Sequence, residues 1–175
     1  PALVEQARAN AGRPFPWGGN YAAARAVSLR LGAEEKSEGV ALVGRHDRPV
    51  VRFADGTSGV LLEGDIGHPI SFTVHPSFAS IGTREYYVRA TVRRVAPGNV
   101  GMNLLYEVAD SQGHGPYANT GRWFGTTADA GWQTHTWRVT DACFSKMWGY
   151  DITLRPEQSI PFALGRVEVS TRPFE

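Results

Sequence analysis

Aromatic and polar side chains gather in one polar segment of the chain, between residues 110 and 130. Tyr117, Asn119, Arg122 and Trp123 all lie there. A segment this long without apolar periodicity predicts a loop, and long loops in compact domains usually carry function. Indole and phenol rings stack on the flat C–H faces of pyranose rings, while amide and guanidinium groups bind their hydroxyls. The segment therefore predicts a carbohydrate-binding loop, with Trp123 as its leading candidate.

Two predicted strands present side chains of the same kinds. Residues 86–95 and 102–109 alternate between apolar and polar side chains, so one face of each strand is expected to be buried and the other to face solvent. The outward positions supply the remaining candidate sugar ligands: Tyr87, Arg89, Asn103 and Glu107.

Catalysis is the alternative that the carboxylates leave open. A glycoside hydrolase needs two carboxyl groups roughly 5 to 9 Å apart, and the candidates are Glu63, Asp65, Glu107, Asp110 and Asp151. The chain has no nucleophile elbow, phosphate-binding loop, dinucleotide fingerprint or zinc-protease motif. Its histidines are scattered, and the single cysteine, Cys143, has apolar neighbours that predict a buried thiol. No catalytic residue is predicted.

The other tryptophans are interpreted as structural. Trp137 shares its strand parity with Val139, which indicates packing in the core. Trp132 opens the same strand after Gly131 and is expected at the edge of the core, and Trp148 is expected to cover one end of the fold.

The composition indicates one globular domain without a strongly charged surface. At 175 residues the chain can bury a sizeable core. The net charge of +1 gives no field to recruit nucleic acid or an anionic membrane. No apolar run approaches the roughly 20 residues that cross a bilayer, and no signal peptide is recognised at the start.

The pattern of elements predicts an all-β fold. Short alternating runs follow one another from residue 39 to the end, with no helical period between them and many Gly and Pro residues at the connections. Such spacing is typical of an antiparallel β-sandwich. Residues 2–11 favour a helix, the prolines that follow end it, and residues 22–31 suit either helix or strand. We therefore expect a short irregular or helical N-terminal arm (residues 1–37) before a β-sandwich domain (residues 38–175).

The last three runs carry a resemblance to a known class of protein. Gly131-Trp-Gln-Thr-His-Thr-Trp-Arg-Val, Tyr150-Asp-Ile-Thr-Leu and Gly165-Arg-Val-Glu-Val-Ser form a tryptophan-led strand followed by two more alternating strands. This pattern resembles the C-terminal half of jelly-roll carbohydrate-binding modules and of β-sandwich domains attached to glycoside hydrolases.

The resemblance implies non-catalytic binding of a polysaccharide or oligosaccharide, an adjoining catalytic domain as partner, and a secreted or cell-surface location. It also implies a structural calcium ion, for which Asp151, Glu168 and Glu63 are the candidate ligands because carboxylate oxygens suit that ion. Two competing interpretations remain. One is a β-sandwich that packs on a catalytic partner and binds no sugar; the other is a small glycoside hydrolase or polysaccharide lyase.

Overall fold

The protein is a β-sandwich of two antiparallel sheets. The computed structural model describes residues 18–44, 48–63, 69–79, 84–98, 101–109, 116–122, 124–125, 131–157 and 160–175. The strands are β1 (Ala26–Arg30), β2 (Lys36–Glu38), β3 (Val40–Leu42), β4 (Val50–Arg52), β5 (Ser58–Leu62), β6 (Ile70–Val74), β7 (Arg84–Arg94), β8 (Gly101–Glu107), β9 (Tyr117–Asn119), β10 (Phe124–Gly125), β11 (Gln133–Ala142), β12 (Ile152–Pro156) and β13 (Phe162–Ser170). The predicted all-β fold is confirmed, and none of the described segments is a helix that could span a membrane.

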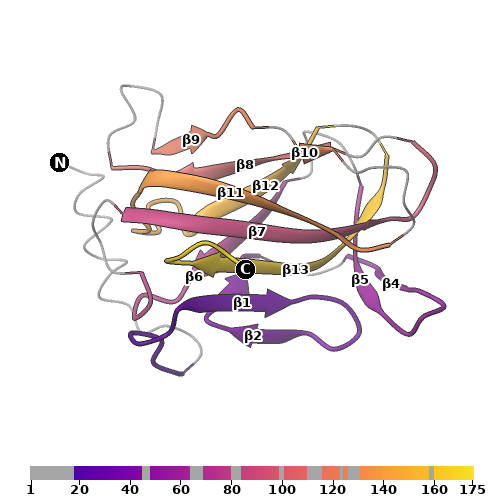
Figure 1. The fold of residues 1–175 in the computed structure, drawn as a ribbon, viewed down its shortest axis with the longest axis horizontal. Helices are drawn as coiled ribbons and strands as arrows, with labels where there is room; N and C mark the ends of the chain where they lie inside the picture. The colour runs from indigo at the N-terminus through magenta and orange to yellow at the C-terminus, as the bar shows by residue number, and fades with distance from the viewer. Residues whose placement is uncertain are drawn as a thin grey trace.

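The strands divide into two sheets that lie face to face (Figure 1). Sheet A has the order β11-β7-β13-β1-β2, with β5 paired to β13 and β4 paired to β5. Sheet B has the order β10-β8-β12-β6-β3, with β9 paired to β8. The β4–β5 hairpin stands at one end of the sandwich, on the right in Figure 1. The first and last strands are therefore neighbours in sheet A, and the hairpin widens that sheet at one end.

Alternation along the strands builds one hydrophobic core between the sheets. In β7 the side chains of Tyr86 and Val88 are buried, while Tyr87 and Arg89, which follow them in turn, are only half-buried. Trp137 of β11 is 1% exposed, and its indole Nε1 donates a hydrogen bond of 2.7 Å to the carbonyl oxygen of Arg122. This burial confirms the predicted core role of Trp137. The hydrogen bond supplies the polar partner that a buried indole N–H group requires.

The N-terminal part of the sandwich begins earlier than the sequence predicted. Residues 26–30, which suited either helix or strand, form β1 and pair along their whole length with β13. Val27 and Leu29 of this strand are buried in the core. β1 and the first two residues of β2 precede the expected boundary at residue 38, and both strands belong to sheet A. The helix expected over residues 2–11 lies outside the described residues.

A bulge in β13 shapes the outer face of sheet A. The pairing of β13 with β7 shifts between Leu164 and Arg166, which leaves Gly165 as the extra residue. A bulge bends its strand and changes the direction of neighbouring side chains. The backbone amide of Leu31, just after β1, donates a hydrogen bond of 2.9 Å to the carbonyl oxygen of Gly165. Gly165 thus lies in β13 beside the end of β1.

Candidate functional site: a hollow beside Trp132

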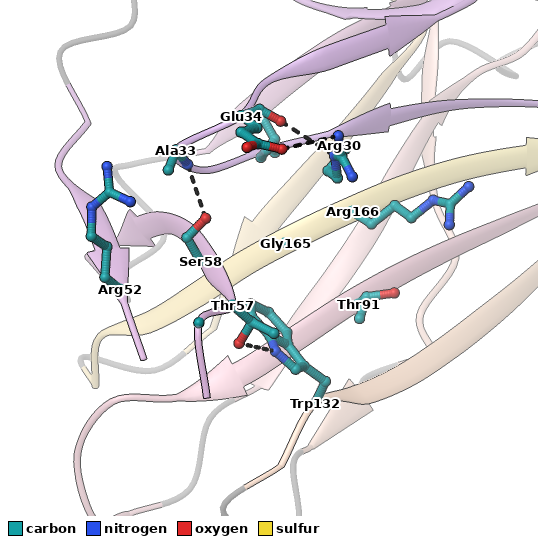
Figure 2. A pocket seen from close by; sticks show the side chains of 12 residues that line it. Arg30, Ala33, Glu34, Arg52, Thr57, Ser58, Thr91, Trp132, Gly165 and Arg166 are labelled. Atoms are coloured by element: carbon teal, nitrogen blue, oxygen red, sulfur yellow. Dashed lines mark hydrogen bonds and ion pairs between the residues drawn. The ribbon is translucent and has the colours of Figure 1, made fainter. Parts of the chain in front are cut away.

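A hollow of about 440 Å³ opens on the outer face of sheet A, over the bulge of β13. Figure 2 shows Trp132 on one side of Gly165 and Ala33 and Glu34 on the other, with Arg52 toward one end and Arg166 toward the other. The lining comes from five separate stretches of chain: residues 30–34, 52–58, 91, 132 and 165–166. The register of sheet A and the β4–β5 hairpin bring these stretches together.

Two glycines seat the indole ring of Trp132 at the side of the hollow. A Cβ atom on Gly165 would lie 2.7 Å from Cζ3 of Trp132, and one on Gly59 would lie 3.0 Å from its Cη2. Contacts this short leave no room for a side chain at either position. The ring therefore rests directly on the backbone of β5 and β13. It is partly exposed, so part of its surface is free to contact a ligand in the hollow.

Two further contacts fix the direction of the Trp132 ring. Its Nε1 donates a hydrogen bond of 2.9 Å to Oγ1 of Thr57, and the ring forms a T-shaped contact with the ring of Phe53, with 5.5 Å between centroids. Both partners belong to the turn between β4 and β5. An aromatic ring held at its polar atom and on two sides loses little conformational freedom when a ligand binds, which favours affinity.

A charged network holds the turn that carries Thr57. Oγ1 of Thr57 donates a hydrogen bond of 2.6 Å to Oδ1 of Asp55, and Nη1 of Arg93 contacts Oδ2 of Asp55 at 2.6 Å. The hydrogen bonds from Thr57 and then the Arg93 guanidinium lower the pKa of Asp55 to about 2. The Arg93 guanidinium also lies over the ring of Phe53, 4.0 Å from its centroid. The turn between β4 and β5, which supports Trp132, is therefore held to β7 through Arg93.

Polar groups occupy the rest of the lining. Oγ of Ser58 accepts a hydrogen bond of 2.9 Å from the backbone amide of Ala33, which ties the β1–β2 connection to β5. Nη2 of Arg30 lies 3.6 Å from Oε2 of Glu34. Nη2 of Arg166 lies 3.4 Å from Oε1 of Glu168. A partly exposed indole surrounded by hydroxyl and guanidinium groups can bind a polar ring that has one apolar face.

Two of the predicted ligand residues lie on the same outer face. Arg89 of β7 holds Glu168 of β13 through Nε at 2.7 Å and Nη2 at 3.1 Å, and its guanidinium lies 3.9 Å from the ring centroid of Phe174. The hydroxyl of Tyr87 donates a hydrogen bond of 2.8 Å to Glu85. Neither residue lines the hollow itself, but Glu168 links Arg89 to Arg166, which does.

The other predicted residues that the structure describes lie in or beside sheet B, away from the hollow. Amide groups of Asn103 and Asn119 are hydrogen-bonded to each other, and Oγ1 of Thr120 donates to Asn103 at 2.6 Å. Arg122 is exposed, just after β9. Trp123, the leading candidate, lies outside the described residues. The structure thus brings Asn103 and Asn119 together, while placing Tyr87 and Arg89 on a different sheet.

Glu107 proves to be a buried structural group. It is 1% exposed, and its carboxylate accepts hydrogen bonds from the backbone amides of Ser145 (2.7 Å), Lys146 (2.8 Å) and Met147 (3.0 Å). The hydroxyl of Ser145 donates to it as well. Burial raises the pKa of this carboxyl. These bonds hold the segment between β11 and β12 against β8, so the carboxylate has no free oxygen lone pair facing a ligand hollow.

The three predicted calcium ligands lie apart. Asp151 is buried before β12, and Nζ of Lys146 lies 3.0 Å from its Oδ2. Glu168 is held by Arg89 and Arg166 on sheet A, and Glu63 is exposed after β5. No group of three acidic, His or Cys residues that could hold a metal occurs among the described residues. The positions of these three carboxylates do not fit one shared ion; a calcium ion stays a prediction without a placed ligand set.

A second aromatic group lies on the sheet B side. The ring of Tyr117 stacks on Tyr150 at 4.5 Å between centroids and contacts Trp148 at 5.0 Å. Trp148 is 55% exposed. The Tyr117 hydroxyl donates to the carbonyl oxygen of Tyr150 at 2.5 Å, and burial raises its pKa. Tyr117 therefore supports Trp148, which is the exposed ring of this group.

The sequence did not indicate the hollow, although it contained one usable signal. Trp132 was expected at the edge of the core, and the structure places it at the edge with part of the ring in the hollow. Gly165 interrupts an otherwise apolar and alternating strand, and a glycine inside a strand often marks a bulge or a close approach. That signal points to β13, but it does not say that Trp132 is the side chain approaching it.

Comparison with known proteins supports the fold. No family model matches the chain, and no curated protein does either. Among solved structures, the chain is similar to the family 22 carbohydrate-binding module and family 10 hydrolase modules of Clostridium thermocellum xylanase 10B, complexed with xylohexaose (14% identity, TM-score 0.50, covering 77% of this chain and 26% of that one). It is also similar to the family 22 xylan-binding domain of Paenibacillus barcinonensis xylanase 10C (11% identity, TM-score 0.50, covering 84% and 94%).

These likenesses confirm the resemblance seen in the sequence at the level of fold. The protein has the β-sandwich of carbohydrate-binding modules. The chain spans about a quarter of the two-module Clostridium thermocellum chain, which also contains a hydrolase module.

Proposed function

We propose that the protein binds polysaccharide without cleaving it, and that the ligand sits in the hollow beside Trp132. The observation that carries this proposal is the seating of the Trp132 ring. Gly59 and Gly165 remove the side chains that would otherwise fill its place, so the ring is fixed beside an open, polar hollow. A rigid, partly exposed indole among hydroxyl and guanidinium groups matches the two kinds of surface that a pyranose ring presents.

The shape of the hollow favours a segment of a chain over a single buried sugar. Its lining runs from Arg52 at one end to Arg166 at the other, across the strands of sheet A (Figure 2). An open hollow on a sheet face leaves both ends of a bound oligosaccharide free to continue. The two similar solved structures support this proposal, because one is described as complexed with xylohexaose and the other as xylan-binding.

The carboxylates support binding over hydrolysis. A glycoside hydrolase places two carboxyl groups on either side of the scissile bond. Among the residues that line the hollow, the single carboxylate is Glu34, and Arg30 is its ion-pair partner. Two of the carboxylates considered from the sequence, Glu107 and Asp151, are buried and hold loop and strand backbone. We also propose that the protein is secreted or displayed at the cell surface, and that it targets an adjoining catalytic domain to the polysaccharide.

The test is titration of the chain with a panel of plant and microbial polysaccharides, with reducing-sugar release measured in parallel. We expect binding to at least one glycan, no release of reducing ends, and loss of binding in Trp132→Ala. Trp148→Ala is the matched control, because it removes the exposed indole on the sheet B side. Loss of binding in Trp148→Ala alone would show that the ligand binds at the aromatic group of Tyr117, Trp148 and Tyr150 on the sheet B side. Absence of binding to every glycan would favour a purely structural domain, and turnover would overturn the non-catalytic role.

A further inference from the structure

We infer that the hollow beside Trp132 selects acidic glycans, in which sugar rings carry a carboxylate. This inference rests on the proposed function and adds the chemical class of the ligand. Three guanidinium groups line the hollow, those of Arg30, Arg52 and Arg166, against one carboxylate, that of Glu34. The lining therefore has a net charge of +2, although the whole chain has a net charge of only +1.

The three arginines differ in the ion pairs that they form within the protein. Arg30 pairs with Glu34 at 3.6 Å, and both side chains are more than half exposed. Such a pair is weak, so it exchanges readily for a stronger anion. Arg166 contacts Glu168 at 3.4 Å, but Arg89 already holds that carboxylate with two shorter hydrogen bonds. Arg166 is thus a second, looser partner with donors to spare.

Arg52 differs from Arg30 and Arg166. Within the part of the chain that the structure describes, no hydrogen bond or ion pair forms at its side chain. It lies at the end of β4, the outermost strand of the hairpin, and is exposed. Figure 2 shows this side chain at one end of the group of residues that line the hollow. An arginine of this kind is available to a ligand.

The side chains of the hollow match the groups of an acidic sugar. A guanidinium group matches the planar, two-oxygen geometry of a carboxylate and binds it through two parallel hydrogen bonds. The Trp132 ring supplies an apolar surface for the sugar ring that bears this carboxylate. Thr91 adds a hydroxyl from β7 on the same side as Arg166. A uronic acid residue presents a flat ring face, hydroxyls and a carboxylate together, and so fits all three features.

The experiment compares pairs of ligands in which one member carries an anionic group that the other lacks. Galacturonan oligosaccharides are titrated beside their methyl esters, and glucuronic acid-substituted xylo-oligosaccharides beside unsubstituted ones, at low and high salt. A sulfated and an unsulfated oligosaccharide of one backbone form a third pair. We expect the carboxylate member of at least one pair to bind about five- to tenfold more tightly. That preference should shrink at about 1 M salt, where charges are screened within about 3 Å.

Variants assign the preference to the hollow. In Arg52→Gln the preference for the acidic ligand should fall at least about threefold, with little change for the neutral one. Arg172→Gln is the matched control, because it removes one positive charge from an exposed site outside the lining. Equal affinity for both members of every pair would overturn the inference and leave sugar binding in place. A preference kept in Arg52→Gln and Arg166→Gln, or one restricted to sulfate, would also overturn it. Failure to bind any oligosaccharide would overturn the proposed function itself.

Discussion

The seating of Trp132 makes Gly165→Ala the most informative single substitution. The added Cβ would lie 2.7 Å from Cζ3 and 2.8 Å from Cη2 of the indole. Carbon atoms in contact prefer about 3.5 to 4.0 Å, so the ring must retreat by about 1 Å. The backbone at Gly165 does not have a positive φ, so alanine fits there without backbone strain. The clash with Trp132 is then the main effect.

The retreat of the ring should weaken both stability and binding. Overpacking of this kind costs about 1 to 3 kcal/mol of the free energy of unfolding. Moving the ring also disturbs the 2.9 Å hydrogen bond from its Nε1 to Thr57. Loss of well-placed aromatic contact is worth about 0.5 to 1.5 kcal/mol, so we expect oligosaccharide affinity to fall about two- to twelvefold.

Calorimetric titration measures the affinity, and urea unfolding confirms that the variant is folded. Gly131→Ala is the control, because a Cβ there meets open space although the residue adjoins Trp132. If folded Gly165→Ala binds as tightly as Gly131→Ala, the idea that the seated ring contacts the ligand is refuted.

Three further predictions concern the scaffold. Trp137→Ala should lower the free energy of unfolding by about 3 to 5 kcal/mol in urea titrations, because it empties a large core site and frees the carbonyl of Arg122; a loss below about 1 kcal/mol would contradict the core assignment. Lys146→Met should cost about 3 to 5 kcal/mol by leaving the buried Asp151 without its cation, and an unchanged unfolding midpoint would show that the pair is dispensable. Because burial raises the pKa of Glu107 above its usual 4.5, the folded chain holds this proton more firmly than the unfolded chain. The stability that this group contributes is therefore present below pH 4.5 and is lost as pH rises through the folded pKa. In Glu107→Gln the free energy of unfolding should fall less steeply with pH above pH 4.5. If it falls as steeply as in the original chain, the raised pKa of Glu107 is contradicted.

The scaffold was predictable because alternation reports directly on which side chains face the core. Tyr86, Val88 and Trp137 were expected inside and are buried there. The pairing of β1 with β13 was not predictable, since the Ala-rich stretch before Val27 favours helix by propensity. Contacts with the last strand of the chain override that local preference.

The site was less predictable, because parity says that a side chain faces outward but not what lies beside it. Glu107 occupies an outward position, yet the segment from Ser145 to Met147 folds over it and takes up its oxygens. Trp132 and Arg52 are far apart in sequence and line one hollow because β4, β5 and β13 pair in sheet A. The bulge at Gly165, which a sequence pattern does not locate in three dimensions, decides where the indole rests.

The central claim is that a sugar chain contacts the seated ring of Trp132, and nuclear magnetic resonance of the indole N–H groups tests it most directly. The chain has five tryptophans, and Trp→Phe substitutions assign their signals in ¹⁵N-labelled protein. During titration with a binding oligosaccharide, we predict a saturable shift of the Trp132 Nε1 signal while that of Trp148 stays in place. A saturable shift of the Trp148 signal with Trp132 unchanged would contradict the account and assign the ligand to the sheet B side.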